Sequence, residues 1–167
     1  AVRRLSETVD RELGGLDILV NNAGIGRFAD LGALAPEDWR ALMGTNLDGV
    51  YYCIHEALPR FRARGGGWIV NIASLAGKNP FAGGAAYNAS KFGLCGLSEA
   101  VMLDHRYENV RVTAVLPGSV STDFSRSGMA DWKIQPEDVA AAVGMILAMP
   151  ERTLISHVEI RPSTRPQ

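Results

Sequence analysis

Four short apolar runs alternate with amphipathic stretches along the chain. The runs cover residues 18–22, 68–72, 110–116 and 154–160, and the first two are almost continuously hydrophobic. Such runs are typical of strands covered on both faces, as in parallel sheets. Strands that alternate with helices at this rhythm predict an α/β fold with a parallel sheet and right-handed crossovers.

The intervening stretches carry the periodicity of amphipathic helices. Apolar side chains recur at helical spacing from Val2 to Leu13, and Gly14 and Gly15 then end the pattern. Helices are also predicted over 36–61, 85–107 and 136–148. Three arginines mark the end of the helix predicted over 36–61: Arg60, Arg62 and Arg64. We interpret them as cations that complement the negative end of the helix dipole, and a phosphate site is the alternative.

Composition narrows the class of protein. The 167 residues carry 17 Lys+Arg against 18 Asp+Glu, so the basic surface of a nucleic-acid binder is not expected. The longest apolar stretch, 139–149, is much shorter than the ~20 residues of a membrane span. Cys53 and Cys95 lack metal or redox spacing and read as free thiols, and the scattered histidines predict no metal site. We expect one domain over 1–167 in the cytoplasm, with no nucleic-acid or membrane partner.

A tyrosine and a lysine share one face of the helix predicted over 85–107. Tyr87 and Lys91 are four residues apart, which places them one turn from each other. A phenol has an ordinary pKa of about 10. A nearby ammonium stabilises the phenolate, so this pair is suited to proton transfer near neutral pH.

Polar and small residues gather where the predicted strands end. Ser74 follows the second strand at the carboxyl edge of the sheet, where α/β sheets place ligands; its hydroxyl is either an oxyanion partner or a helix cap. Asn46 lies on the inward face of a helix, where a buried amide needs partners. The segments 21–24 and 117–122 follow the first and third strands. Their small residues either let the backbone pass close to a flat or charged group or form plain turns.

Taken together, these residues resemble the short-chain dehydrogenase/reductase family over essentially the whole chain. Asn21, Asn22, Ala23 and Gly24 are similar to its Asn-Asn-Ala-Gly motif. A second set matches its catalytic tetrad, including the step of thirteen residues from Ser to Tyr: Asn46, Ser74, Tyr87 and Lys91. A third set matches its nicotinamide-contacting segment: Pro117, Gly118, Val120 and Thr122.

The resemblance implies an oxidoreductase that transfers hydride between NAD or NADP and a small carbonyl or secondary-alcohol substrate. It implies that Tyr87 is the general acid and base, that Lys91 lowers its pKa and binds the nicotinamide ribose, and that Ser74 orients the carbonyl. Asn46 would hold a water in a proton relay. Asn22, Ala23 and Gly24 would border the cofactor, and a homo-oligomer, a dimer or tetramer, is expected.

One element of the family pattern is missing from the sequence. No Gly-rich turn follows a first strand, although such a turn receives the pyrophosphate in dinucleotide-binding folds. We therefore expect a Rossmann-like parallel sheet that lacks the first strands and the Gly-rich loop, in an N-terminally truncated chain. We expect weak NAD(P) binding by this chain alone and an exposed apolar edge at 18–22. The alternative is a catalytically silent remnant that serves as an oligomerisation or binding scaffold.

The segment 121–133 has two interpretations. In the family it forms a substrate lid, and here it carries Phe124, Met129 and Trp132 among small and polar residues. A surface loop is the alternative. His55 and His157 are expected to be structural.

Overall fold

The computed structural model describes residues 1–124 and 128–164. Within them, one sheet of four parallel strands has the order β1-β2-β3-β4, so sequential strands are neighbours. The strands are β1 (Ile18–Asn21), β2 (Gly67–Ile72), β3 (Val110–Pro117) and β4 (His157–Ile160). The predicted parallel α/β sheet is confirmed, and the last strand begins later than the apolar run at residue 154.

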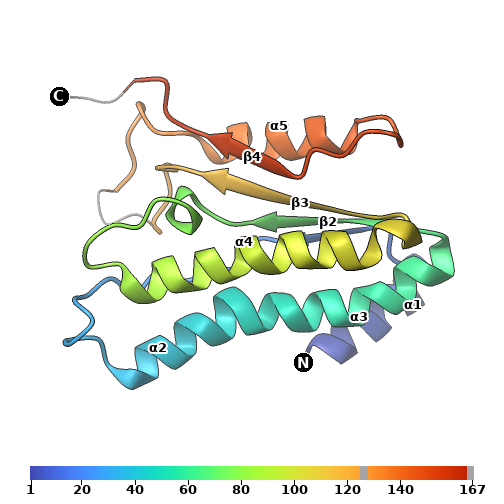
Figure 1. The fold of residues 1–167 in the computed structure, drawn as a ribbon, viewed down its shortest axis with the longest axis horizontal. Helices are drawn as coiled ribbons and strands as arrows, with labels where there is room; N and C mark the ends of the chain where they lie inside the picture. Colours follow the sequence, from blue (N-terminus) through green and yellow to red (C-terminus); the bar gives the residue numbers. More distant parts are fainter. Residues whose placement is uncertain (125–127, 165–167) are drawn as a thin grey trace.

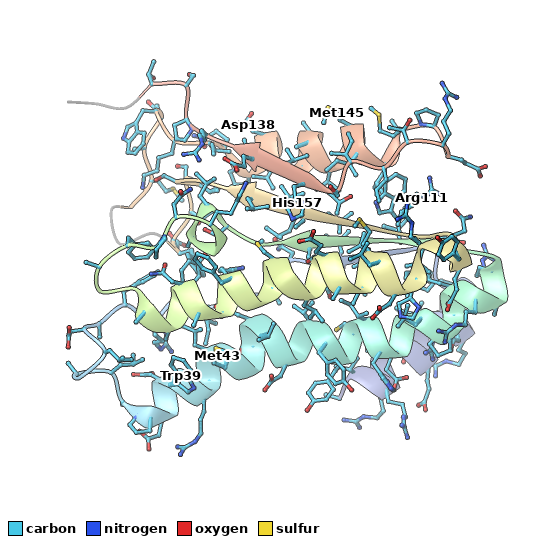
Figure 2. The ribbon with its side chains drawn as sticks, viewed as in Figure 1. Trp39, Met43, Arg111, Asp138, Met145 and His157 are labelled. Atoms are coloured by element: carbon cyan, nitrogen blue, oxygen red, sulfur yellow. The ribbon has the colours of Figure 1, made fainter. Side chains whose placement is uncertain are left out.

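Helices flank the sheet on both faces (Figure 1). The α-helices are α1 (Val2–Leu13), α2 (Pro36–Met43), α3 (Gly49–Arg64), α4 (Ala85–His105) and α5 (Pro136–Leu147). Three short helical turns complete the set: η1 (Gly44–Asp48), η2 (Leu75–Gly77) and η3 (Arg106–Glu108). Helix α5 begins with a capping box, in which Asp138 Oδ2 accepts from Gln135 N at 2.8 Å (Figure 2).

Alternation along the central strands divides the core between the two faces. On β2, Ile69 packs in the cluster formed with α3 and α4, whereas Trp68 and Val70 pack with α5. On β3, Val112 and Val115 divide in the same way. Because successive strand side chains point to opposite faces, β2 and β3 carry apolar side chains on both faces and are buried on both sides.

The helix predicted over 36–61 is interrupted by a π-helical turn. Helix α2 ends at Met43, η1 follows, and α3 continues to Arg64, three residues beyond the predicted end. Gly44 is the first residue of η1, and Gly49 is the first residue of α3. Single π-helical turns of this kind occur often at functional sites. The sequence periodicity did not reveal the turn, because one extra residue shifts the apolar pattern only slightly.

The arginines near the end of α3 form ion pairs. Arg62 Nε lies 2.6 Å from Glu108 Oε2, and Arg64 Nε lies 2.8 Å from Asp17 Oδ1. Arg60 pairs with Asp10 at 2.7 Å. These contacts tie the helix end to neighbouring segments, which supports the structural interpretation over a phosphate site.

Strand β1 forms one edge of the sheet. Ile18 and Val20 are 45% and 46% exposed, in agreement with the predicted apolar edge. Among the described residues, no helix has the length and apolarity needed to cross a membrane, and no His, Cys, Asp and Glu side chains gather as metal ligands. Cys53 and Cys95 are free thiols. His157 lies on the opposite edge strand, β4 (Figure 2).

Candidate active site

The four predicted catalytic residues converge beside the carboxyl ends of β1 and β2. Tyr87 and Lys91 lie on the first turns of α4, and Ser74 follows β2 and is hydrogen-bonded to Tyr87. Lys91 Nζ donates to the carbonyl of Ile72, the last residue of β2, at 2.9 Å. The site is therefore assembled from α4 and from the segments that leave the sheet.

Tyr87 is held in a nearly dry environment. Its side chain is buried, and this burial raises the pKa of the phenol, while the hydrogen bond with Ser74 lowers it. Lys91 Nζ lies 5.7 Å from the centroid of the Tyr87 ring. Burial is the larger effect, and the pKa-lowering role that the resemblance implies for Lys91 stays a prediction.

Lys91 is an ammonium in a buried position, 6% exposed. Burial lowers its pKa to about 8, and the nearby Cys95 acts in the opposite direction. Among the described residues its single hydrogen bond is the one to Ile72 O. An ammonium carries several N–H donors, so Lys91 retains donors for a bound group.

Asn46 connects the π-turn to the loop that follows β1. Its Oδ1 accepts from Ile25 N at 2.8 Å, and its Nδ2 donates to Ile25 O at 3.0 Å and to Ser90 Oγ at 3.2 Å. The buried amide thus finds the partners that burial requires. The side chain positions the loop against α4, and the water-holding role implied by the resemblance stays a prediction.

Ser74 combines the two functions that the sequence left open. Its Oγ accepts from Ala76 N at 3.1 Å and so caps η2, and the same hydroxyl is bonded to Tyr87. Because a hydroxyl both donates and accepts, the two contacts are compatible. The cap fixes the serine side chain next to the phenol.

The predicted cofactor-bordering residues lie along this same edge of the sheet. Asn22 and Ala23 are exposed beyond the end of β1, and Gly24 is half-buried. A Cβ on Gly24 would lie 3.4 Å from Asn46 Oδ1 and 3.9 Å from Lys91 Nζ, so glycine leaves space beside the lysine. Four further predicted residues lie at or after the end of β3: Pro117, Gly118, Val120 and Thr122. Gly118 N donates to Ile160 O at 2.8 Å.

These features fit the nicotinamide end of a dinucleotide. The bare backbone at Gly24 and the remaining donors of Lys91 suit a ribose hydroxyl pair, and the edge is the usual ligand edge of parallel α/β sheets. No glycine-rich turn for a pyrophosphate occurs in the sequence. The fit therefore covers one half of such a ligand.

A buried polar chain anchors α4 to the sheet below the site. Asn21 Nδ2 donates to Asn71 Oδ1 at 2.8 Å, and Asn71 Nδ2 donates to Ser98 Oγ at 2.9 Å. Asn71 was missed in the sequence, because a single polar residue in an apolar run gives no signal of its own. Its contacts join β1, β2 and α4 into one unit.

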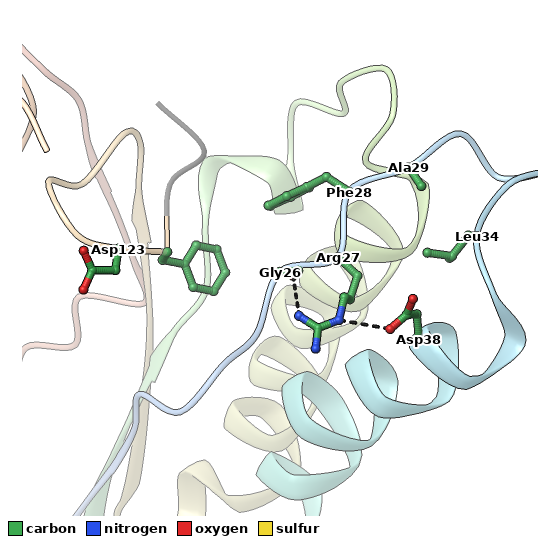
Figure 3. Close-up of a pocket in the computed structure, with 8 residues that line it drawn as sticks. Gly26, Arg27, Phe28, Ala29, Leu34, Asp38 and Asp123 are labelled. Carbon is green, nitrogen blue, oxygen red and sulfur yellow. Dashed lines mark hydrogen bonds and ion pairs between the residues drawn. The ribbon is translucent and has the colours of Figure 1, made fainter. Parts of the chain in front are cut away.

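The sequence did not predict that aromatic side chains surround Tyr87. Phe28, Phe81 and Phe124 have ring centroids 5.3, 6.4 and 5.8 Å from that of Tyr87. Phe28 and Phe124 also line a cleft of about 340 Å³ (Figure 3). The three phenylalanines come from three loops far apart in sequence, so no local pattern links them. Phe124, which the sequence placed in a possible lid, borders this cleft.

Comparisons with known proteins match this arrangement. A family model described as short chain dehydrogenase matches residues 1–132. The chain is 38% identical over 168 residues to the sepiapterin reductase of Chlorobaculum tepidum. The alignment covers 98% of this chain and 68% of that protein. Other curated relatives are matched over as little as 49% of their length.

Solved structures give the same result. A metagenomic short-chain oxidoreductase in complex with NADP has a TM-score of 0.84 at 38% identity, over 98% of this chain and 69% of that one. A 4-hydroxyisoleucine dehydrogenase complexed with NADH has a TM-score of 0.86 at 27% identity, over 96% and 74%. Both solved relatives hold a nicotinamide dinucleotide, which supports the cofactor prediction.

Proposed function

The chain belongs to the short-chain dehydrogenase family, and from this premise we propose that it catalyses hydride transfer between NAD or NADP and a carbonyl or secondary-alcohol substrate. One observation carries the proposal: the buried Tyr87 and Lys91 lie one helical turn apart on α4, with Lys91 Nζ 5.7 Å from the Tyr87 ring centroid and bonded to the end of β2 at the ligand edge of the sheet.

The proposed proton chemistry follows from this environment. In the reducing direction, the Tyr87 hydroxyl donates its proton to the carbonyl oxygen of the substrate while Ser74 donates a hydrogen bond to the same oxygen. A reduced nicotinamide, when bound, would supply the hydride that, together with the proton from Tyr87, converts the carbonyl to an alcohol. Because burial raises the pKa of Tyr87, the phenol stays protonated at neutral pH, as an acid in reduction must.

Lys91 has two parts in this proposal. Its pKa of about 8 leaves it mostly charged near neutral pH, so it stabilises the phenolate that remains after proton donation. Its remaining N–H donors hold the nicotinamide ribose. In this proposal the nicotinamide would lie along residues that follow the ends of β1 and β3: Asn22, Ala23, Gly24, Pro117, Gly118, Val120 and Thr122. We expect the 167 residues alone to bind the dinucleotide weakly, and micromolar affinity in a calorimetric titration would contradict this.

The experiment that tests the function compares two tyrosine variants. Tyr87→Phe removes the phenolic proton and is expected to lower turnover of a ketone panel with NADH or NADPH by about 10²–10⁴-fold, with an unchanged circular dichroism spectrum. Tyr107→Phe is the matched control, because Tyr107 is 94% exposed, and its turnover should equal that of the parent. Retained turnover in Tyr87→Phe would remove the mechanism.

A catalytically silent oligomerisation or binding scaffold is the second candidate. It predicts no turnover by the parent protein at saturating NADH or NADPH.

We also propose that the protein is a homo-oligomer in the cytoplasm. The assembly is proposed because α3 exposes Tyr51 and Tyr52 side by side, with ring centroids 5.2 Å apart. Sedimentation analysis that finds only a monomer would contradict this assembly.

A further inference from the structure

We propose that the site binds a neutral ketone or secondary alcohol whose reacting carbon carries an aromatic or similarly flat, apolar group. The inference rests on the proposed function and specifies its substrate class. It starts from the three phenylalanines around Tyr87, which are here called the phenylalanine cluster: Phe28, Phe81 and Phe124.

The rings of the cluster have interacting geometries. Phe28 meets Tyr87 edge-to-face at an interplanar angle of 65°, and it meets Phe124 at 80° with centroids 6.4 Å apart. Phe28 and Phe81 lie 5.9 Å apart. Aromatic pairs favour these tilted and edge-on arrangements. A flat ring placed beside them gains the same type of contact.

Glycines make room for the rings of the cluster. A Cβ on Gly26 would lie 2.7 Å from the Phe28 ring and 3.2 Å from the Phe124 ring. A Cβ on Gly84 would clash with the ring of Phe81. A parallel bridge between Ala29 and Gly84 joins the two loops. The backbone therefore fixes where the rings lie, so the apolar wall is part of the fold.

The adjacent cleft has the size for one small ring compound. Its volume is about 340 Å³, at the lower end of the roughly 300–1,000 Å³ of small-molecule sites. Phe28 and Phe124 form its apolar walls together with Leu34. The same two phenyl rings pack against Tyr87, so the cleft and the proposed proton donor share this aromatic wall.

The charges of the cleft disfavour anionic substrates. Arg27 Nε is paired with Asp38 Oδ1 at 3.0 Å, and Arg27 also donates to Gly26 O (Figure 3). Asp123 adds a second carboxylate to the lining. Among the described lining residues, carboxylates thus outnumber cations, so a carboxylate or phosphate on the substrate meets net repulsion.

The test measures affinity and turnover for two ketone probes with the protein at saturating NADPH or NADH. The probes are acetophenone, a neutral aryl ketone, and acetoacetate, an anionic ketone without a ring. We expect tighter binding of acetophenone in calorimetric titrations and a higher kcat/KM. Phe28→Ala should weaken acetophenone binding about tenfold, and the smaller change Phe28→Leu should weaken it several-fold through loss of the ring contacts.

The matched control is Phe92→Ala. Phe92 lies on α4 like Tyr87, is 45% exposed and is outside the cluster, so its substitution should leave both affinities unchanged. Equal affinity for the two probes, or acetophenone binding unaffected in both Phe28 variants, overturns the inference. Turnover of acetoacetate without aryl preference refutes only the substrate class. Cluster-dependent binding of acetophenone with no turnover of either probe supports the inference and refutes the proposed function.

Discussion

Replacement of Lys91 by methionine should make the fold more stable while it removes the proposed activity. The ammonium is buried, and its single hydrogen bond among the described residues is to Ile72 O. Burial of a charge with so few partners opposes folding. Methionine has a similar length and carries no charge, so it fills the same space without that cost.

The magnitude follows from the pKa. The folded protein lowers the pKa of Lys91 from 10.5 to about 8, which corresponds to about 3 kcal/mol of cost to the folded state when the lysine is charged. Loss of the Ile72 hydrogen bond offsets about 1 kcal/mol of this. We therefore expect Lys91→Met to raise the free energy of unfolding by about 1–2 kcal/mol at neutral pH.

The pH dependence fixes the sign. A lysine whose pKa is lower when folded binds fewer protons in the folded state between about pH 8 and 10.5, so the parent gains stability as pH rises through that window. The methionine variant lacks this gain. Urea denaturation of both proteins at several pH values should show an advantage of the variant that is full below pH 8 and shrinks above it. A variant that is less stable at neutral pH, with no pH-dependent difference, would refute the reasoning.

Three further substitutions test separate contacts. Ser74→Ala should raise the pKa of Tyr87, since it removes the hydrogen bond that lowers it, and ultraviolet titration of the phenol reports this. Asn71→Ala should destabilise the fold by about 1–3 kcal/mol in urea, because it removes the buried acceptor of Asn21 Nδ2 and the buried donor to Ser98 Oγ. Gly67→Ala should lower the free energy of unfolding by at least as much as Asn71→Ala, because the new Cβ would clash with the ring of Phe61. Thermal unfolding reports this loss, and an unchanged melting temperature would contradict this packing.

The sequence predicted the elements of the fold better than the contacts between them. Apolar runs and helix-ending signals located the strands and helices to within a few residues, because burial on two faces and capping leave local patterns. The tetrad was predicted from spacing and resemblance, and Tyr87 and Ser74 do meet. The clamp of Asn46 on Ile25 was not predictable, because it depends on a π-turn and on a loop 21 residues away.

The polar surroundings of Tyr87 show the same limit. Helical spacing places Lys91 on the correct face, but it does not state which polar atom reaches the phenol. In the structure Lys91 bonds to the end of β2, and Ser74 reaches the hydroxyl instead. Tertiary packing therefore decides which polar atoms lie next to the phenol.

The residues of the proposed chemistry and those of the phenylalanine cluster stand on different kinds of support. Tyr87 and Lys91 belong to a helix anchored in the core, whereas Phe28, Phe81 and Phe124 lie on loops outside the regular elements. Loops accept substitution far more readily than buried helices do. The proposed selectivity is therefore open to redesign, or to evolutionary drift, one loop at a time, while the proposed proton donor stays in place.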